Sequence, residues 1–531
     1  MDDKLREEIN RRRTFAIISH PDAGKTTLTE KFLLFGGAIN TAGSVKGKAN
    51  SKYAVSDWMD IEKERGISVT SSVLQFNYDG YCINILDTPG HQDFSEDTYR
   101  TLMAADSAVM VIDASKGVEA QTIKLFKVCV MRHIPIFTFI NKMDRDARDT
   151  FELLDDIETV LGIKTCPVNW PIGSGKEFKG VYDRKTQVVS TFQAISTGGA
   201  KKAAETDYHI EDDELKKLVG PYLYDQFKEE IELIDGATDE MDIEKVRAGE
   251  LSPVFFGSAL NTFGIEQFLN YFLQMTTPPL GRNSSEGIID PVTEPFSAFV
   301  FKIQANMNKA HRDRIAFMRI CSGKFEAGME VYHAASKRKI KLSQPQQLMA
   351  QDRKIVEEAY AGDVIGVFDP DLFSIGDTLT TGGKKFEYEG IPTFAPEHFC
   401  RVVQLNSMKR KQFVKGVTQI AQEGAIQIFQ EYTAGLSEII VGVVGVLQFD
   451  VLKYRLENEY GCEIRLEPIP YNFIRWVKDP TVDVTKLKRV SDVKKVKDMK
   501  GNPLLLFANE WVIDQVLQHN EGLELEEFRK N

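Results

Sequence analysis

A loop of small and polar residues follows the first apolar stretch of the chain, and its residue types suit phosphate binding. Residues 19–26 read Ser-His-Pro-Asp-Ala-Gly-Lys-Thr, which is a P-loop pattern except that Ser19 replaces the expected first glycine. Gly24 lets the backbone curl so that successive N–H groups point at phosphate oxygens, and the dipole of the following helix adds to their attraction. Lys25 supplies a cation for the β- and γ-phosphates, and the Thr26 hydroxyl is placed to ligate Mg²⁺. The predicted phosphate site comprises Ser19, His20, Pro21, Asp22, Ala23, Gly24, Lys25, Thr26 and Thr27.

A second loop, at residues 141–144, indicates which base the nucleotide carries. The carboxylate of Asp144 can accept hydrogen bonds from N1–H and from the N2 amino group of guanine, whereas adenine has neither donor at these positions. Binding adenine would leave a desolvated carboxylate unpaired, which costs on the order of a few kcal/mol. Asn141 can brace the loop or reach N7, and the Lys142 stem can cover the base. The predicted guanine loops comprise Asn141, Lys142, Met143, Asp144, Ser258 and Ala259, the last two being placed to give a backbone N–H to guanine O6.

A third loop, at residues 87–91, has the residue types for sensing and hydrolysing a terminal phosphate. Asp87 fits a carboxylate that reaches Mg²⁺ through water, and the Gly90 N–H can bond the γ-phosphate. Loss of that phosphate would release the segment, which is how such loops switch. His91 is the candidate for positioning the attacking water, although a single histidine is more often structural. The predicted residues of this loop are Asp87, Thr88, Pro89, Gly90 and His91.

Apolar runs in the N-terminal half alternate with helical patterns, which is typical of a parallel α/β sheet. Four of the five predicted strands end in Gly, Asp, Asn or Ser, and ligands in such sheets bind at the carboxyl ends of strands. We therefore expect the three loops to lie at one edge of this sheet. The predicted strands are Thr14–Ser19, Tyr81–Leu86, Ala108–Ile112, Ile134–Ile140 and Val254–Phe256, with a helix at Leu28–Phe35.

The rest of the chain predicts an insertion and two further domains. Acidic helical stretches around a Gly- and Lys-rich piece indicate an insertion at about 160–250, followed by a linker at 276–287. Short β-runs between residues 294 and 379 favour a small antiparallel barrel. From residue 392 onward, strands and helices alternate as in an α/β sandwich. The predicted fold is α/β multidomain, with a P-loop GTPase domain at 1–280, a β-barrel at 281–388 and a C-terminal α/β domain at 389–531.

Composition narrows the class of protein. The chain has 531 residues, of which 42% are hydrophobic and 27% charged, and it has no apolar run of bilayer length. The six cysteines are scattered singly, which favours reduced thiols in a cytoplasmic protein, with no membrane attachment. A net charge of −12 argues against DNA binding. Between residues 471 and 500, however, the chain has nine Lys or Arg and only four Asp. This segment is therefore either a solvated surface or a patch that binds RNA.

In this order, the motifs resemble those of the translational GTPases, the family of elongation factors Tu and G. Residues 60–70 are similar to the first switch of that family, in which a Thr after Arg-Gly-Ile binds Mg²⁺ and the γ-phosphate. Here that position is Ser68, which keeps the hydroxyl, and Thr70 is a possible substitute. Asp22 and His91 match the P-loop aspartate and catalytic histidine of the family. Pro21 and Ile67 fall where the family has a hydrophobic gate in front of that histidine, and proline is unusual at this position.

Finer similarity, in the stretches 19–27, 41–46, 91–101 and 141–155, points to the class II release factors within that family. The resemblance implies a protein that binds GTP and Mg²⁺, engages the ribosome after peptide release, and drives off the class I release factor that read the stop codon. We also expect a monomer. Only about 140 residues follow the predicted barrel. We therefore expect the chain to lack the extra C-terminal domains of elongation factor G.

Three alternatives remain at this stage. One is a translocase-like or ribosome-protection GTPase, which the missing domains disfavour. Another is a regulatory GTP-binding module that acts away from the ribosome, which the barrel directly after the GTPase domain disfavours. The last is a P-loop kinase or ATPase, which Asp144 disfavours.

Overall fold

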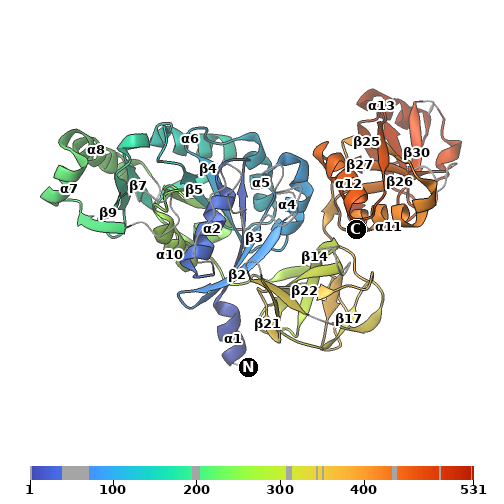
Figure 1. Cartoon of the computed structure of the whole chain (residues 1–531), viewed down its shortest axis with the longest axis horizontal. Coiled ribbons are helices and arrows are strands. Elements are labelled where there is room, and N and C mark those ends of the chain that lie inside the picture. Colours follow the sequence, from blue (N-terminus) through green and yellow to red (C-terminus); the bar gives the residue numbers. More distant parts are fainter. Residues whose placement is uncertain are drawn as a thin grey trace.

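The computed structural model describes residues 3–38, 71–193, 204–238, 240–305, 314–342, 345–349, 352–432, 439–488, 492–527 and 529–530. Figure 1 shows three groups of elements: an α/β region at the N-terminal side, a β-rich region below it and a C-terminal α/β region beside it. No helix in the described ranges is long and apolar enough to cross a membrane. The α/β multidomain fold predicted from the sequence is confirmed.

The N-terminal region is built on a seven-stranded sheet in the order β2-β3-β1-β4-β5-β11-β6. Neighbouring strands are parallel except for β2, which runs antiparallel to β3. The inner strands are buried along their whole length, as expected when helices cover both faces. The strands are β1 (Arg12–Ser19), β2 (Ser72–Tyr78), β3 (Tyr81–Asp87), β4 (Ser107–Asp113), β5 (Ile136–Asn141), β6 (Lys164–Pro167) and β11 (Leu251–Phe256).

All five predicted strands are present, but β2 and β6 were missed. The signal for β2 is a two-residue turn, because Asp79 and Gly80 both have positive φ, at 47° and 79°. Asp-Gly is the favoured sequence for a tight hairpin with both central residues in that conformation. The turn pairs Tyr78 with Tyr81 and thereby adds an antiparallel edge strand to a sheet predicted to be parallel.

Alternating residues of each strand face two separate cores. Phe15 and Ile17 of β1 face a core that helices α2 and α10 complete, whereas Ala16 and Ile18 face helices α4, α5 and α6. This two-sided packing leaves the strand ends as the exposed edge of the sheet. The helices are α1 (Asp3–Asn10), α2 (Lys25–Phe35), α4 (Ser95–Leu102), α5 (Ala120–Met131), α6 (Thr150–Leu161) and α10 (Ile265–Met275), with the short helix η1 (Gln92–Phe94).

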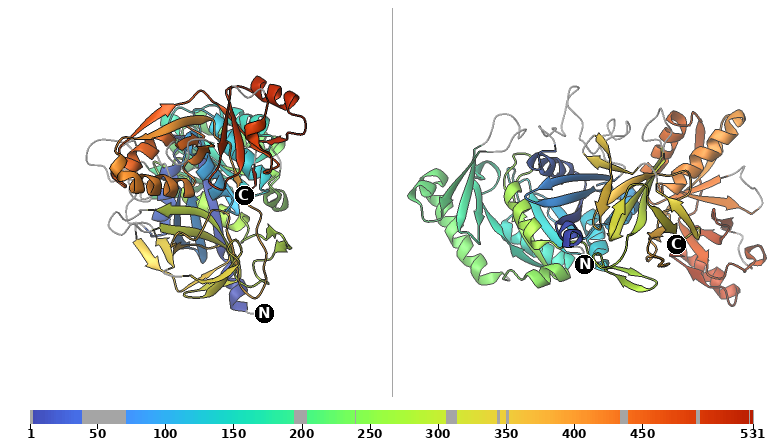
Figure 2. Two further views of the ribbon diagram at one scale, coloured as in Figure 1. Left: turned by 90° about the vertical axis from the view of Figure 1, so that its right-hand side faces the viewer. Right: turned by 90° about the horizontal axis from the view of Figure 1, so that it is seen from below.

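The predicted insertion forms a substructure of its own. Its antiparallel sheet has the order β10-β9-β8-β7, and helices α7 and α8 pack on it. Figures 1 and 2 show it at the end of the molecule farthest from the C-terminal region. Its elements are β7 (Asn169–Ile172), η2 (Gly175–Glu177), β8 (Gly180–Asp183), β9 (Val188–Gln193), β10 (Ala204–His209), α7 (Asp213–Val219) and α8 (Pro221–Ala237), with α9 (Ile243–Ala248) leading back to β11.

The described residues within the predicted barrel range form antiparallel β-structure. One sheet has the order β18-β17-β23-β14-β15-β22-β19-β20, and β16 pairs with β21. The linker predicted at 276–287 ends in a small hairpin, β12 (Arg282–Ser284) with β13 (Gly287–Ile289). The other strands are β14 (Ser297–Ala305), β15 (Arg314–Ser322), β16 (Lys324–Glu326), β17 (Glu330–His333), β18 (Arg338–Lys341), β19 (Gln346–Met349), β20 (Asp352–Ile355), β21 (Glu358–Tyr360), β22 (Val364–Phe368) and β23 (Thr378–Thr380).

The C-terminal region has an eight-stranded sheet in the order β28-β25-β27-β26-β30-β31-β29-β32. Part of the Lys-rich segment forms strand β30, where Lys494 pairs with Glu431 at 2.5 Å. The elements are β24 (Pro392–Thr393), β25 (His398–Gln404), η3 (Ser407–Lys409), α11 (Arg410–Gln422), β26 (Gln427–Glu431), β27 (Ile439–Val443), α12 (Leu447–Asn458), β28 (Ile464–Pro468), β29 (Phe473–Val477), η5 (Val484–Lys486), β30 (Val493–Lys497), β31 (Pro503–Phe507), α13 (Glu510–His519), β32 (Leu525–Glu526) and β33 (Arg529–Lys530).

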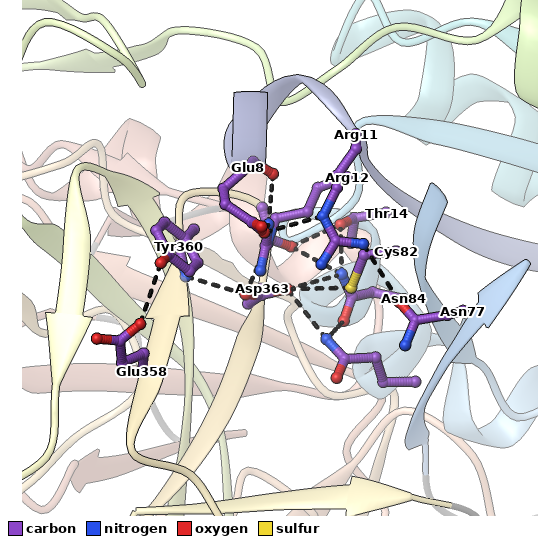
Figure 3. A network of polar contacts seen from close by, with 12 residues as sticks. Glu8, Arg11, Arg12, Thr14, Asn77, Cys82, Asn84, Glu358, Tyr360 and Asp363 are labelled. Carbon is purple, nitrogen blue, oxygen red and sulfur yellow. Dashed lines mark hydrogen bonds and ion pairs between the residues drawn. The ribbon is translucent and has the colours of Figure 1, made fainter. Parts of the chain in front are cut away.

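A buried polar network joins the N-terminal region to the β-rich region (Figure 3). Asp363, between β21 and β22, accepts hydrogen bonds from Arg12 Nε at 2.7 Å, Gln75 Nε2 at 3.0 Å and the Tyr360 N–H at 2.9 Å. The side chain of Ile9, from helix α1, is buried in the core of the β-rich region. The two regions therefore share a continuous interior. The domain boundary at residue 280 remains a prediction from the sequence.

Replacing Asp363 with asparagine should lower the free energy of unfolding by about 3 kcal/mol, because it leaves the guanidinium of Arg12 buried without this carboxylate. The measurement is chemical denaturation followed by tryptophan fluorescence. Asp371→Asn is the matched control, because Asp371 pairs with Arg314 in the same region but its side chain is 62% exposed. That change should cost less than about 1 kcal/mol. Equal effects of the two substitutions would contradict the importance of the buried network.

Candidate nucleotide site

The predicted loops lie at the carboxyl ends of four strands that share one edge of the N-terminal sheet. Ser19 ends β1, residues 20–24 form the next loop, and Lys25, Thr26 and Thr27 begin α2. Asp87 ends β3 and is followed by residues 88–91. Asn141 ends β5 and is followed by residues 142–144, while Ser258 and Ala259 follow β11. Ser68 and the other predicted first-switch residues lie outside the described residues.

The phosphate loop follows a path that needs unusual backbone angles. Asp22 and Gly24 have positive φ values of 65° and 99°. A Cβ atom on Gly24 would lie 2.2 Å from Nδ2 of Asn141, so a larger residue would collide with the guanine loop. Glycine is therefore required here both for the turn and for the close approach.

Side chains of the guanine loop hold the phosphate loop in place. Asn141 donates from Nδ2 to the Ala23 carbonyl at 2.8 Å, and Lys142 donates from Nζ to the Asp22 carbonyl at 2.5 Å. These contacts fit the bracing role predicted for Asn141. These two hydrogen bonds also hold the predicted base loop and the phosphate loop in a fixed position relative to each other.

One residue that contacts the predicted guanine loop, Asp113, was missed by the sequence reasoning. Its Oδ2 lies 2.6 Å from Nζ of Lys142, and its Oδ1 accepts from the N–H of Ser115 at 2.9 Å. Burial would raise the pKa of Asp113, but the hydrogen bonds from Lys142 and Ser115 outweigh burial and lower it. The available signal was its position, because Asp113 ends a strand as Asp87 and Asn141 do.

Asp144 has the unmet hydrogen-bonding capacity that guanine would satisfy. Its Oδ1 is buried, and no described residue donates a hydrogen bond to it. Buried carboxylate oxygens are normally paired, because an unpaired one costs roughly 1–3 kcal/mol. An acceptor in this state fits the N1–H and N2–H donors of guanine.

The loop after β11 differs from the prediction in one respect. The N–H of Ala259 is donated to Oδ1 of Asn141 at 2.8 Å, and the N–H of Ser258 is donated to the Phe263 carbonyl at 3.1 Å. An N–H from either residue can reach guanine O6 only by sharing or exchanging its present bond. The sequence could not reveal this, because both partners are set by the tertiary contacts of the loop.

The two charged residues predicted to meet phosphate and Mg²⁺ are paired with each other. Nζ of Lys25 lies 2.5 Å from Oδ1 of Asp87, and both side chains are buried. Thr29 lies one turn further along α2 and donates to the same oxygen at 3.4 Å. If Lys25 binds phosphate as predicted, it would move away from Asp87, and the carboxylate would then be available for a hydrated cation.

His91 stands at the start of η1, where its ring caps the short helix. Nδ1 accepts the Asp93 N–H at 3.2 Å and lies 3.4 Å from Oδ1 of the same residue. In a neutral ring with this bond, the proton resides on Nε2. The side chain is 29% exposed, so it can still be reached from solvent. The same loop packs on the phosphate loop, because a Cβ on Gly90 would lie 3.7 Å from Cα of Pro21.

Comparison with known proteins extends these observations to the whole chain. Residues 10–278 match the family described as elongation factor Tu GTP binding domain, and residues 295–382 match elongation factor G domain 2. Residues 388–517 match class II release factor RF3, C-terminal domain. A peptide chain release factor 3 of Symbiobacterium thermophilum is 57% identical over 521 residues, which are 98% of each chain. The chain belongs to the peptide chain release factor 3 family.

Other similar proteins support membership of the same family. The release factor 3 of Gloeobacter violaceus is 53% identical over 99% of this chain and 98% of its own. A crystal structure of a Thermus thermophilus protein shares the fold, with a TM-score of 0.69 at 22% identity over 87% of this chain and 69% of that chain. As a member of the release factor 3 family, the chain is a guanine-nucleotide-binding GTPase of translation termination that interacts with the ribosome. The resemblance to translational GTPases is confirmed, and the translocase-like alternative is not favoured.

Proposed function

We propose that this member of the release factor 3 family uses GTP binding on the ribosome to promote dissociation of the class I release factor after peptide release. GTP hydrolysis then frees the family member itself from the ribosome. The observation that carries the GTP-dependent part is Asp144, whose buried oxygen lacks a donor among the described residues. The choice of class I factors as the displaced partner rests on family membership.

In the proposed mechanism, different residues bind the phosphates, select the base and orient the attacking water. The phosphate loop and Lys25 bind the phosphates, and Lys25 leaves its partner Asp87 to do so. Asp144 selects guanine, and Asn141 and Lys142 keep the base loop fixed to the phosphate loop. His91 orients the attacking water.

The donor set also fits Mg²⁺. Thr26 would bind it directly and Asp87 through water, and Ser68 is proposed as the hydroxyl of the first switch. Bound there, the ion would neutralise charge on the phosphate oxygens. The hydroxyl and carboxylate oxygens of Thr26 and Asp87 are the ligand types that this hard cation prefers.

The test follows a labelled class I release factor on ribosomes that have already released their peptide. Its dissociation rate is measured with this protein plus GTP, GDP or ATP. Acceleration with GTP and none with ATP is the expected result. A factor that stays bound, while ribosomes still stimulate GTP hydrolysis, would move the activity to another step of termination.

A further inference from the structure

The C-terminal region contacts the N-terminal region directly after the loop that carries His91. The N–H of Leu447, the first residue of α12, is donated to Oδ2 of Asp93 at 2.8 Å, across 354 positions of sequence. Figure 1 shows α12 on the side of the C-terminal region that faces α4. Asp93 thus caps the N-terminus of α12 from another region of the molecule, and its negative charge suits the positive end of the helix dipole.

The fit around Asp93 is close. A Cβ atom at Gly445 would lie 2.2 Å from Cγ of Asp93 and 2.4 Å from its Cα, which no ordinary contact permits. The side chain of Gln448 accepts the N–H groups of Val444 and Gly445 at 3.0 Å, so the turn before α12 is itself fixed. Glycine at position 445 therefore allows α12 to approach Asp93.

Asp93 also contacts His91. Its N–H is donated to Nδ1 of the His91 ring at 3.2 Å, and its Oδ1 lies 3.4 Å from the same nitrogen. One residue, 7% exposed, therefore joins the ring of His91 to the first turn of α12. Any displacement of α12 relative to η1 must change this three-residue arrangement.

The contacts that flank Asp93 come from the next helix, and they include one hydrogen bond and one aromatic contact. Nη2 of Arg100 donates to the Gly424 carbonyl at 3.1 Å, and the ring of Tyr99 meets that of Phe394 edge to face at 5.0 Å. The apolar cores of the C-terminal region contain no described residue of the N-terminal region. By contrast, the main N-terminal core includes Phe299 and Phe317 of the β-rich region. Ile391 belongs to that same N-terminal core and Phe394 packs against it. The strands and helices from β25 onward can therefore shift without opening a shared core, with residues 391–394 as their attachment.

We propose that Asp93 is a positioning residue that fastens the His91 segment to α12, so that the placement of the C-terminal region sets the orientation of the His91 ring. The ribosome can then control hydrolysis by moving the C-terminal region. This inference rests on the proposed role of His91 in hydrolysis.

The test alters Gly445, on the C-terminal side of the contact, and observes the ring of His91 on the N-terminal side. Gly445→Ala places a methyl group against Asp93 without altering any residue of the nucleotide site. Val446→Ala is the matched control, because Val446 is the next residue and is 56% exposed. The protein is labelled with ¹³C in its histidine rings, and the His91 signal is assigned by its loss in His91→Ala. The second readout is single-turnover GTP hydrolysis with excess ribosomes.

The His91 signal should move in Gly445→Ala and stay in place in Val446→Ala. Stimulated hydrolysis should fall at least about fivefold in Gly445→Ala, with the GTP concentration for half-maximal rate within about twofold of the parent. In a His91→Ala background, Gly445→Ala should have no further effect, because coupled residues are not additive.

An unmoved His91 signal in Gly445→Ala, or an equal rate loss in the His91→Ala background, overturns the inference. If His91→Ala alone left stimulated hydrolysis intact, the proposed role of His91 would fail instead, and the two failures are thus distinguishable. Asp93→Asn gives a second route if Gly445→Ala does not fold, because it keeps the shape of the side chain and removes its charge. An unmoved His91 signal in Asp93→Asn would equally overturn the inference.

Discussion

Replacing His91 with alanine should lower ribosome-stimulated GTP hydrolysis on the order of 10³-fold while leaving GTP affinity within about twofold of the parent. The imidazole sits on the loop after β3, which packs against Pro21 of the phosphate loop, and none of the predicted base or phosphate contacts depends on it. Its loss should therefore remove an interaction with the attacking water and spare binding. Nucleotide affinity is measured by equilibrium fluorescence and turnover by phosphate release with saturating ribosomes.

The control for this substitution is His209→Ala, which removes an exposed histidine on β10 of the insertion. It should leave both affinity and turnover unchanged. Full stimulated turnover in the His91 variant would exclude this residue from catalysis. A parallel loss of GTP affinity would instead assign it to binding.

Replacing Asp144 with asparagine should weaken GTP binding by about two orders of magnitude and reduce the preference for GTP over ATP. The substitution exchanges one acceptor oxygen for an amide that presents N–H donors to the N1–H and N2–H of guanine. Because the site is partly buried, water cannot fully replace the lost pairing. Competition of GTP, ATP and xanthosine triphosphate for a fluorescent nucleotide gives the three affinities. The affinity for xanthosine triphosphate should rise, since xanthine has an oxygen at the position of the guanine amino group.

Asp146→Asn is the matched control for that measurement, because Asp146 is exposed and lies two residues further along the same loop. It should retain the preference for GTP. If the Asp144 variant were as selective for GTP as the parent, the guanine-binding role of this loop would be wrong.

Local patterns in the sequence were sufficient to predict the strands that carry the site. The runs before Ser19, Asp87 and Asn141 are apolar and short, and each ends in residues whose chemistry suits a nucleotide. The alternation of strands and helices predicted from residue 392 onward is also present, as in β25, α11, β26, β27 and α12, because hydrophobic periodicity distinguishes the two kinds of element. The hairpin at Asp79-Gly80 was overlooked although its turn signal is present in the sequence.

The guanine selectivity that we propose for Asp144 is likewise a prediction from the sequence, since it rests on the hydrogen-bond donors that one carboxylate at the end of one strand can accept. What only the tertiary structure decided are contacts between residues far apart in the chain: Lys142 with Asp113 and the phosphate loop, Lys25 with Asp87, and Leu447 with Asp93. Periodicity reports which face of an element is buried, but not which distant element lies against it. For that physical reason the chemistry of the nucleotide loops could be predicted from the sequence, whereas the way the C-terminal region meets His91 required the fold.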